Sequence, residues 1–297
     1  MALAPIALFV YNRPDHARAT LAALAANQQA ADSDLVVFSD GPKDGRSEAL
    51  VKQVRARVRA AAGFRSVTLL ERATNAGLVT AITEGVGRMC AEHDRVIVLE
   101  DDLVTAPQFL SFMNEALDRY VREPRVMQVS GYMYPTARPG GRQAVFLPAT
   151  SCWGWGTWRR AWDAYDPAMA GLDELAADPE RRRAFNLDGA YDYFGMAEDH
   201  RAGLVNSWGV VWHLSVFVKR GLVLYPPRSL VSNLGFDGSG THAGSSDLGK
   251  VRLAESSARF DLPDRIEVDQ EVYADVKNVI RRSQKGWKHW LRNLLPA

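Results

Sequence analysis

Four short apolar runs, separated by segments of helical length, limit most strongly what this chain can fold into. The runs end in turn signals and cover residues 5–11, 35–38, 67–70 and 95–99. Continuous apolar runs of this length are typical of strands buried on both faces, as in parallel sheets covered by helices. Right-handed crossovers place every strand-to-helix loop at one edge of such a sheet. The sequence therefore predicts an α/β fold with ligands at the carboxyl ends of its strands.

The alternation of strands and helices stops after residue 130. A Pro/Gly-rich stretch over 135–141 precedes an aromatic segment over 152–162, and residues 173–205 have the composition of polar helices. Residues 222–225 predict one further strand. We therefore expect three parts, with bounds at 1–130, 131–260 and 261–297.

Charge and cysteine content exclude several classes of protein. The 36 Lys and Arg residues balance 35 Asp and Glu residues, so no basic surplus indicates a nucleic-acid binder. Two cysteines outside any CxxC pair, Cys90 and Cys152, indicate free thiols in a reducing cytoplasm rather than a disulfide framework. No apolar run reaches the ~18 residues of a transmembrane helix. The N-terminal run lacks a basic start, so we expect a strand there and not a signal peptide.

Three adjacent carboxylates, Glu100, Asp101 and Asp102, close the fourth apolar run. Their charges repel one another, and a divalent cation would compensate them. Oxygen ligands of this kind suit Mg²⁺ or Mn²⁺, which commonly bridge one or two carboxylates and a substrate phosphate. The other interpretation is a solvated acidic turn, but the position at the end of a buried strand favours the metal site.

Residues around these carboxylates resemble a known family. The sequence Val98-Leu99-Glu100-Asp101-Asp102-Leu103, followed by Ala106-Pro107, resembles the acidic motif of N-acetylglucosaminyltransferase I and its relatives. Residues 151–158 and 229–242 extend the resemblance, which covers roughly residues 5–245 and is to family 2-like glycosyltransferases of the GT-A fold. It implies a mostly parallel central sheet with helices on both faces. It also implies a metal-dependent, inverting hexosyl- or N-acetylhexosaminyltransferase.

The resemblance assigns roles to the acidic motif and to one histidine. Asp102 matches the ligand of a Mn²⁺ or Mg²⁺ cofactor that holds the diphosphate of a nucleotide-sugar. Asp101 matches a contact to the ribose, or to the metal through water, and Glu100 would support the motif. His242 ends a glycine-rich run in a segment that closes the site in such enzymes, so it is expected to meet the metal or the diphosphate.

Residues after the first three predicted strands match the nucleoside-binding part of the family, with a UDP-sugar favoured as donor. They are Tyr11, Asn12, Arg13, Asp40 and Asn75. In similar enzymes an aspartate placed like Asp40 accepts a hydrogen bond from uracil, and the planar guanidinium of Arg13 could reach the diphosphate or the base. The alternatives are ordinary turn residues, a surface arginine and, for Asn75, a residue that starts a helix.

Tryptophans and glycines of the aromatic segment are the next candidates. Trp153 and Trp155 would stack on sugar rings or line the acceptor site, and Gly154 would let the backbone approach the donor closely. The alternative is that one or more of these rings belongs to the core. Trp158 and Trp162, four residues apart, are expected to pack on one helix.

Inverting transfer needs a general base that takes the proton of the acceptor hydroxyl. The family places a carboxylate about a hundred residues after the metal motif, which matches Asp199 first and Glu198 second. The alternative for both is an exposed helix face. Some relatives carry Ser-Trp-Asp where this chain has Ser207-Trp208-Gly209, so Asp192 and Asp237 stay in reserve.

The resemblance also gives the three parts their expected roles. Residues 1–130 would be the nucleotide-sugar-binding half, and 131–260 the acceptor-binding and catalytic half of the same GT-A domain. Residues 261–297 would be a basic amphipathic helical tail. Lys277 to Ala297 contain six Lys and Arg and no acidic residue, which suits an anionic membrane surface. We expect a cytoplasmic protein, peripheral at the inner face of the plasma membrane through residues 278–297; packing of the tail on the domain is the alternative.

The function predicted from these residues is transfer of a sugar to a glycan or lipid-linked glycan acceptor. One alternative is a glycan-binding or scaffold protein on a degenerate transferase fold. Another is a sugar nucleotidyltransferase, which would need a glycine-rich phosphate loop after the first strand. Asn12-Arg13-Pro14-Asp15 is a poor loop of that kind.

Overall fold

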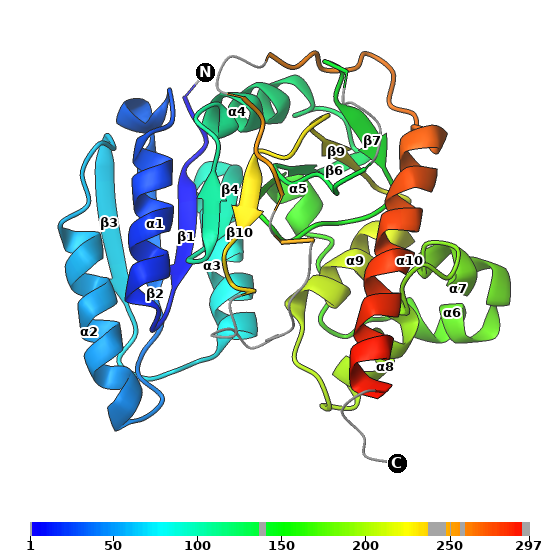
Figure 1. Cartoon of the computed structure of the whole chain (residues 1–297), viewed down its shortest axis with the longest axis horizontal. Helices are drawn as coiled ribbons and strands as arrows, with labels where there is room; N and C mark the ends of the chain where they lie inside the picture. The colour runs from blue at the N-terminus through cyan, green and yellow to red at the C-terminus, as the bar shows by residue number, and fades with distance from the viewer. Residues whose placement is uncertain (1, 137–140, 237–247, 250, 256–258, 293–297) are drawn as a thin grey trace.

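An eight-stranded sheet runs through the centre of the protein (Figure 1). The computed structural model describes residues 2–136, 141–236, 248–249, 251–255 and 259–292, with side chains up to residue 284 in the last helix. The strand order is β3-β2-β1-β4-β8-β6-β9-β7. The strands are β1 (Ile6–Val10), β2 (Asp34–Ser39), β3 (Ser66–Glu71), β4 (Arg95–Glu100), β6 (Val126–Ser130), β7 (Val145–Leu147), β8 (Trp155–Trp158) and β9 (Leu222–Tyr225).

The direction of the strands confirms the predicted α/β class. Strands β3, β2, β1 and β4 are parallel neighbours, and β6 and β9 pair in parallel further along. Strands β8 and β7 pair antiparallel with their neighbours, so the sheet is mostly parallel. All four apolar runs form strands of the parallel part. Strands β1 and β4 are buried along most of their length, as such runs predict, whereas β2 alternates and the edge strand β3 has no buried residue.

Helices cover both faces of the sheet. Helix α1 packs against α2, whereas α3 packs against α5 and α9. The helices are α1 (Pro14–Ala25), α2 (Gly45–Arg59), α3 (Leu78–His93), α4 (Phe109–Arg119), α5 (Arg159–Trp162), α6 (Leu172–Ala177), α7 (Pro179–Phe185), α8 (Tyr193–Arg201), α9 (Trp208–Val218) and α10 (Gln270–Arg292), with a short 3₁₀ turn at Ala30–Asp32. The predicted bound at residue 130 coincides with the end of β6, inside one continuous sheet, and the division into parts stays a prediction.

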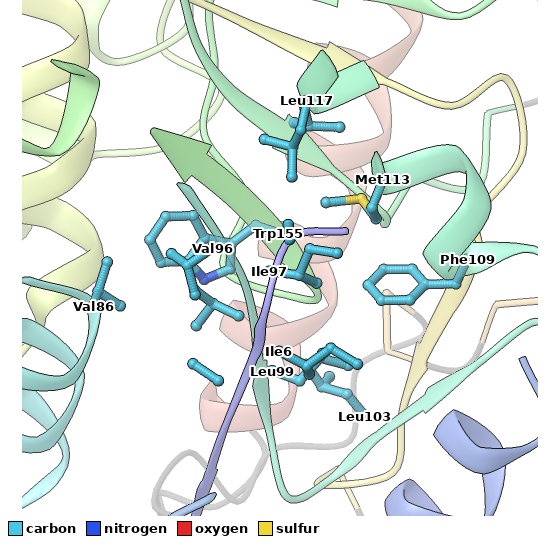
Figure 2. Packing of buried hydrophobic residues seen from close by; sticks show 14 of the residues in the cluster. Ile6, Val86, Val96, Ile97, Leu99, Leu103, Phe109, Met113, Leu117 and Trp155 are labelled. Atoms are coloured by element: carbon cyan, nitrogen blue, oxygen red, sulfur yellow. The ribbon is translucent and has the colours of Figure 1, made fainter. Parts of the chain in front are cut away.

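The main core surrounds the middle strands, with residues of α4 among those packed on them and Val86 of α3 as well (Figure 2). Ile97 of β4 and Phe109 of α4 are fully buried, and Trp155 of β8 is 1% exposed. The expectation of Trp158 and Trp162 on one helix is wrong, because Trp158 ends β8 and only Trp162 lies on α5. The spacing of four residues therefore does not indicate one helix here, because the boundary between β8 and α5 lies between the two tryptophans.

A two-stranded antiparallel sheet ties a distant segment to the acidic motif. Strand β5 (Leu103–Thr105) follows the three carboxylates directly and pairs with β10 (Val231–Asn233), with Leu103 opposite Asn233. The main-chain N–H of Leu234 donates to the carbonyl of Asp102 at 2.8 Å. Two of the segments that carried the family resemblance therefore lie side by side.

The first half of α10 packs on the protein. Tyr273, Val276, Val279 and Ile280 are buried, and they belong to a cluster that includes Tyr225 of β9. Lys277 of α10 also donates to Asp188 at 2.5 Å. In the part of the chain that the structure describes, no helix combines the length and hydropathy needed to cross a bilayer.

One histidine of α9 is part of the core between α7 and α8. His213 is 1% exposed, and its ring stacks on Phe185 at 4.9 Å between ring centres. Its Nε2 lies 3.2 Å from the carbonyl of Phe185, and its Nδ1 lies 3.3 Å from the hydroxyl of Thr150. The carbonyl can only accept, so the neutral ring carries its proton on Nε2. Burial lowers the pKa of His213 to about 4.

The burial of neutral His213 leads to a prediction of how the free energy of unfolding depends on pH. The folded protein keeps His213 neutral, whereas the unfolded chain binds a proton below its ordinary pKa of 6.5. Stability is therefore lost as pH falls from 6.5 to about 4. We expect His213→Gln to remove about 1 to 3 kcal/mol of that loss. Urea unfolding at pH 7, 5.5 and 4.5 measures it, with the exposed His93→Gln as control. Equal pH dependence in His213→Gln and the unmodified protein would contradict the assignment.

Candidate functional site

Two carboxylates are buried where β4 ends. Asp101 is 3% exposed and Asp102 is 8% exposed. The main-chain N–H of Tyr11, just after β1, donates to Asp101 Oδ2 at 3.2 Å. The hydroxyl of Thr20 on α1 donates to the carbonyl of Asp101 at 2.7 Å. The ends of two adjacent parallel strands and the helix that follows β1 thus fix this pair.

A guanidinium group bridges the two carboxylates. Arg13 Nη2 contacts Asp101 Oδ1 and lies 2.9 Å from Asp102 Oδ2. Burial by itself would lower the pKa of Arg13, but the charges of Asp101 and Asp102 raise it above its usual value. Burial raises the pKa of Asp101, and Arg13 opposes that rise. Arg13 is therefore the counterion of this pair.

The first carboxylate of the motif has a different environment. Burial, followed by the charges of Asp102 and Asp101, raises the pKa of Glu100 to about 8, and Arg13 opposes the rise. Burial and the neighbouring aspartates thus disfavour the charged form of Glu100. This agrees with a supporting position for Glu100 rather than a place in the charged pair.

The site fits a divalent cation on two observations. The Arg13 guanidinium already stands where positive charge is needed, between oxygens of Asp101 and Asp102. A Cβ built on Gly235 would lie 2.3 Å from Asp102 Oδ2, so any side chain at position 235 would collide with the carboxylate that the ion needs. Among the described residues, no group of three or more His, Cys, Asp and Glu could hold a metal. Mg²⁺ and Mn²⁺ commonly take one or two carboxylates and complete their shell with water and phosphate.

Asp40, the predicted uracil contact, is occupied by hydrogen bonds within the protein. Its Oδ1 accepts from the N–H groups of Gly41 and Ala76 at 2.8 and 2.9 Å. Its Oδ2 accepts from Asn75 Nδ2 and the N–H of Gly77, both at 2.9 Å. A carboxylate offers about four acceptor positions, and these donors use them. Asp40 and Asn75 thus lie together, as predicted for one sheet edge, and join the loops after β2 and β3.

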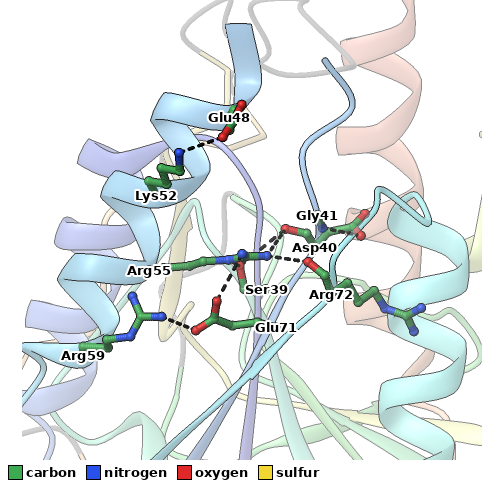
Figure 3. Close-up of polar contacts among 9 residues, drawn as sticks. All are labelled: Ser39, Asp40, Gly41, Glu48, Lys52, Arg55, Arg59, Glu71 and Arg72. Carbon is green, nitrogen blue, oxygen red and sulfur yellow. Dashed lines mark hydrogen bonds and ion pairs between the residues drawn. The ribbon is translucent and has the colours of Figure 1, made fainter. Parts of the chain in front are cut away.

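Arg55 of α2 is a positioning residue that the sequence did not single out (Figure 3). It donates to Ser39 Oγ at 3.0 Å and to the carbonyls of Asp40 and Arg72 at 3.2 and 2.7 Å. Its Nη1 also pairs with Glu71 at 3.1 Å. Arg55 therefore fastens the ends of β2 and β3 to each other. Its place in a helix with several other arginines gave no signal of this.

The remaining residues of the predicted nucleoside site lie beside the carboxylates. Tyr11 is half-buried, and its hydroxyl accepts from the N–H of Lys43 at 3.2 Å. Asn12 is also half-buried and follows Tyr11 at the end of β1. Tyr11, Asn12 and Arg13 thus share one edge with the carboxylate pair, as the topology of the sheet predicts.

The aromatic segment divides between surface and core. Trp153 is half-buried and meets Tyr132 at 4.7 Å and Phe236 at 5.5 Å between ring centres. Trp155 packs among the rings of Trp162, Trp208 and Trp212, so the prediction of Trp155 at an open site is corrected to a core position.

Gly154 is correct as a site of close approach, but the approaching groups belong to the protein. Its φ is +61°, and a Cβ there would lie 2.6 Å from Val231 and 3.3 Å from Phe109. Gly154 therefore brings β10 and α4 together and leaves no room for the donor at that backbone.

The predicted base residues lie on α8. Glu198 and Asp199 are both exposed on this helix. Asp192 accepts from the N–H of Gly195 at 3.0 Å and caps the start of α8. His242 and Asp237 lie outside the described residues.

Gly209 stands where some relatives carry aspartate, and the space for a side chain at this position is occupied by Cys152. A Cβ on Gly209 would lie 2.8 Å from the sulfur of Cys152. Cys152 in turn lies near enough to Glu100 for that carboxylate to raise the pKa of the thiol, in addition to the larger rise caused by burial. An aspartate at position 209 would therefore have to displace Cys152.

Solved structures of glycosyltransferases share a distant likeness with this chain. GalNAc-T7 with UDP, GalNAc and Mn²⁺ is 10% identical, with a TM-score of 0.48 over 78% of this chain and 44% of that one. TarS of S. aureus is 10% identical, with a TM-score of 0.42 over 78% and 37%. Mouse xyloside xylosyltransferase 1 in its apo form is 12% identical, with a TM-score of 0.39 over 74% and 85%. The chain thus spans less than half of the first two proteins, and no curated protein matches it in sequence.

A family model matches part of the sequence. The model described as glycosyl transferase family 2 matches residues 6–138, which run from β1 through the carboxylate pair and β6. The specific relation to N-acetylglucosaminyltransferase I stays a prediction. Over residues 6–138, this chain is thus similar to glycosyl transferase family 2.

Proposed function

We propose that this protein is a metal-dependent inverting glycosyltransferase. It moves a hexosyl or N-acetylhexosaminyl group from a nucleotide-diphosphate donor to a glycan or lipid-linked glycan. The observation that carries the proposal is the buried pair of Asp101 and Asp102 at the carboxyl end of β4, neutralised by a cationic group, within the family 2 region. Ligands of open α/β sheets bind at such strand ends.

The donor lies along the ends of β1 and β4 in this proposal, with a UDP-sugar favoured. Tyr11 and Asn12 border the nucleoside, and the fork of Arg13 meets a phosphate. Asp102 and Asp101 hold a Mn²⁺ or Mg²⁺ ion, with His242 as a further ligand. When bound, that ion supplies Lewis-acid stabilisation of the leaving diphosphate. Asp40 and Asn75 contribute to nucleoside binding indirectly, because they hold the loops that surround the nucleobase of the donor.

The acceptor lies on a run of aromatic rings that starts beside the carboxylates. Phe236 follows Gly235, which contacts Asp102, and Phe236 meets Trp153. From there Tyr132 and Tyr134 continue the run, 5.1 Å apart between ring centres. Trp153, Tyr134 and Phe236 are all half-buried, so part of each is accessible to solvent. Aromatic faces of this kind suit the apolar faces of sugar rings.

One prediction from this proposal concerns Asp102. We expect Asp102→Ala to abolish sugar transfer and to weaken Mn²⁺-dependent nucleotide binding, because it removes a direct ligand. The fold should survive, since the change also relieves carboxylate repulsion. The measurement is release of nucleoside diphosphate from a panel of nucleotide-sugars with and without Mn²⁺. Asp15→Ala, which changes an exposed carboxylate in the first turn of α1, is the matched control. Unmodified activity in Asp102→Ala would refute the metal assignment.

A second prediction concerns the base. We propose Asp199, with Glu198 as the second choice, because both lie on an exposed face of α8. Asp199→Asn should lower kcat by ~10²–10⁴, the usual contribution of general-base catalysis, and leave donor binding nearly unchanged. Glu198→Gln is the matched neighbour. If Glu198→Gln loses activity instead, the role belongs to that residue; full activity in both variants excludes this face of α8.

We also propose that the end of α10 binds an anionic membrane surface. The packed face of the helix extends to Val279 and Ile280, and the sequence beyond residue 284 contains Lys285, Lys288 and Arg292 without an acidic residue. Basic residues close to an anionic bilayer each contribute about 1 kcal/mol of binding. Membrane binding would bring the protein to the surface where lipid-linked acceptors are found.

The tail prediction uses a deletion chosen from the packing of α10. Removing residues 285–297 keeps Val279 and Ile280, so the protein should stay folded with donor binding intact. Its sedimentation with anionic vesicles should fall sharply. Binding of the full chain should weaken with salt, because exposed charges are screened over ~8–10 Å. A full-length variant with Lys285, Lys288 and Arg292 changed to Gln separates charge from helix length. Equal sedimentation of the deleted and full chains would exclude membrane binding.

A further inference from the structure

Arg13 bridges the two carboxylates with a single nitrogen. Its Nη2 contacts both Asp101 Oδ1 and Asp102 Oδ2. The side chain of Arg13 is 20% exposed, whereas those of Asp101 and Asp102 are 4% and 12% exposed. A buried carboxylate pair without positive charge is strongly destabilising. In the metal-free protein, Arg13 therefore supplies a charge that the site requires.

A divalent cation held by this pair would compete with Arg13 for its carboxylate oxygens. Asp101 Oδ1 and Asp102 Oδ2 both contact the Nη2 nitrogen of Arg13. Asp101 and Asp102 would hold the ion, and they are the same two residues that pair with the guanidinium. Two cationic groups in this space repel each other, and oxygen coordination leaves no room for an N–H donor between ion and ligand.

We propose that Arg13 and the divalent cation are alternative counterions of the Asp101–Asp102 pair. The cation displaces Arg13, and the donor's diphosphate is the anion that then receives the guanidinium. This inference rests on the proposed function, since it takes its metal and its diphosphate from there. It adds that the metal-free protein holds its metal site closed with its own cation.

The backbone allows this exchange without loss of the site. Arg13 directly precedes α1, and its carbonyl accepts from the N–H of Ala17, so the main chain is held while the side chain moves. Asp101 keeps its bond from the N–H of Tyr11, which goes to Oδ2 and not to the oxygen that Arg13 contacts. Asp102 is held through its carbonyl by Leu234. The carboxylates thus keep their positions when Arg13 leaves.

Cooperative binding follows from the exchange. Without nucleotide, the cation must break two ion pairs and leave Arg13 unpaired, so it binds weakly. With a diphosphate present, the released guanidinium gains a new partner, and the two ligands strengthen each other. Coupling of this kind is reciprocal and commonly amounts to about 5–150-fold.

The test measures Mn²⁺ binding by calorimetry, with and without UDP, in Arg13→Gln and in the unmodified protein. We expect Arg13→Gln to bind Mn²⁺ alone about tenfold more tightly, and the coupling between Mn²⁺ and UDP to decrease. Its melting temperature should be lower without metal and should rise more on adding Mn²⁺. Arg13→Lys keeps the positive charge but loses the planar guanidinium group. Its Mn²⁺ affinity should lie between those of Arg13→Gln and the unmodified protein. Arg72→Gln removes a charge that pairs with Glu84 at the same sheet edge, so it controls for general electrostatics.

Unchanged or weaker Mn²⁺ binding in Arg13→Gln and Arg13→Lys would overturn the inference. So would UDP binding without any Mn²⁺ binding in either form, which would make Arg13 a permanent counterion. An equal gain in Arg72→Gln would overturn it as well, because the effect would then be one of net charge. If UDP binds to no form while Arg13→Gln still tightens Mn²⁺ binding, the proposed donor fails and the competition for the carboxylates stands.

Discussion

Burial of two carboxylates side by side is the constraint on which the rest of this structure depends. Asp101 and Asp102 lose nearly all contact with water, and the charge of Asp102 adds to the rise that burial causes in the pKa of Asp101. The guanidinium of Arg13 and the main-chain N–H of Tyr11, both from the end of β1, compensate the buried charge. A position this costly persists in a fold when something binds there, which is why the pair outweighs other acidic residues as evidence of function.

The topology of the sheet brings the compensating groups together. Strands β1 and β4 are parallel neighbours, so Tyr11 and Arg13 emerge at the same edge as the carboxylates. The antiparallel pairing of β5 and β10 then returns Gly235 to Asp102 from a distant part of the sequence. The main chain at Gly235 packs so closely on Asp102 that a side chain there would collide with its Oδ2. The site is thus a consequence of strand order and of one close approach that requires glycine.

The parallel half of the fold and the position of the acidic pair could be predicted from the sequence. The apolar runs indicate the strands, although only β1 and β4 are buried along most of their length. A carboxylate triplet at the end of a buried strand is too costly to be an ordinary turn. Prediction failed at Trp155 and Gly154, because the same residue types serve a core and a sugar site equally well. The role of Arg55 in joining the ends of β2 and β3 could not be foreseen, since it depends on how α2 packs against those strand ends. The hydrogen bonds that occupy both oxygens of Asp40 could not be foreseen either. Their donors are mainly main-chain N–H groups, which every residue type carries, so the sequence gives no sign of them.

The glycine at position 209 has an electrostatic reason as well as a steric one. Its neighbour Cys152 fills the space of a Cβ and lies within the field of Glu100. Burial and the two aspartates already raise the pKa of Glu100 to about 8. A fourth carboxylate beside Cys152 would therefore add repulsion to this group of acidic residues without adding a positive charge.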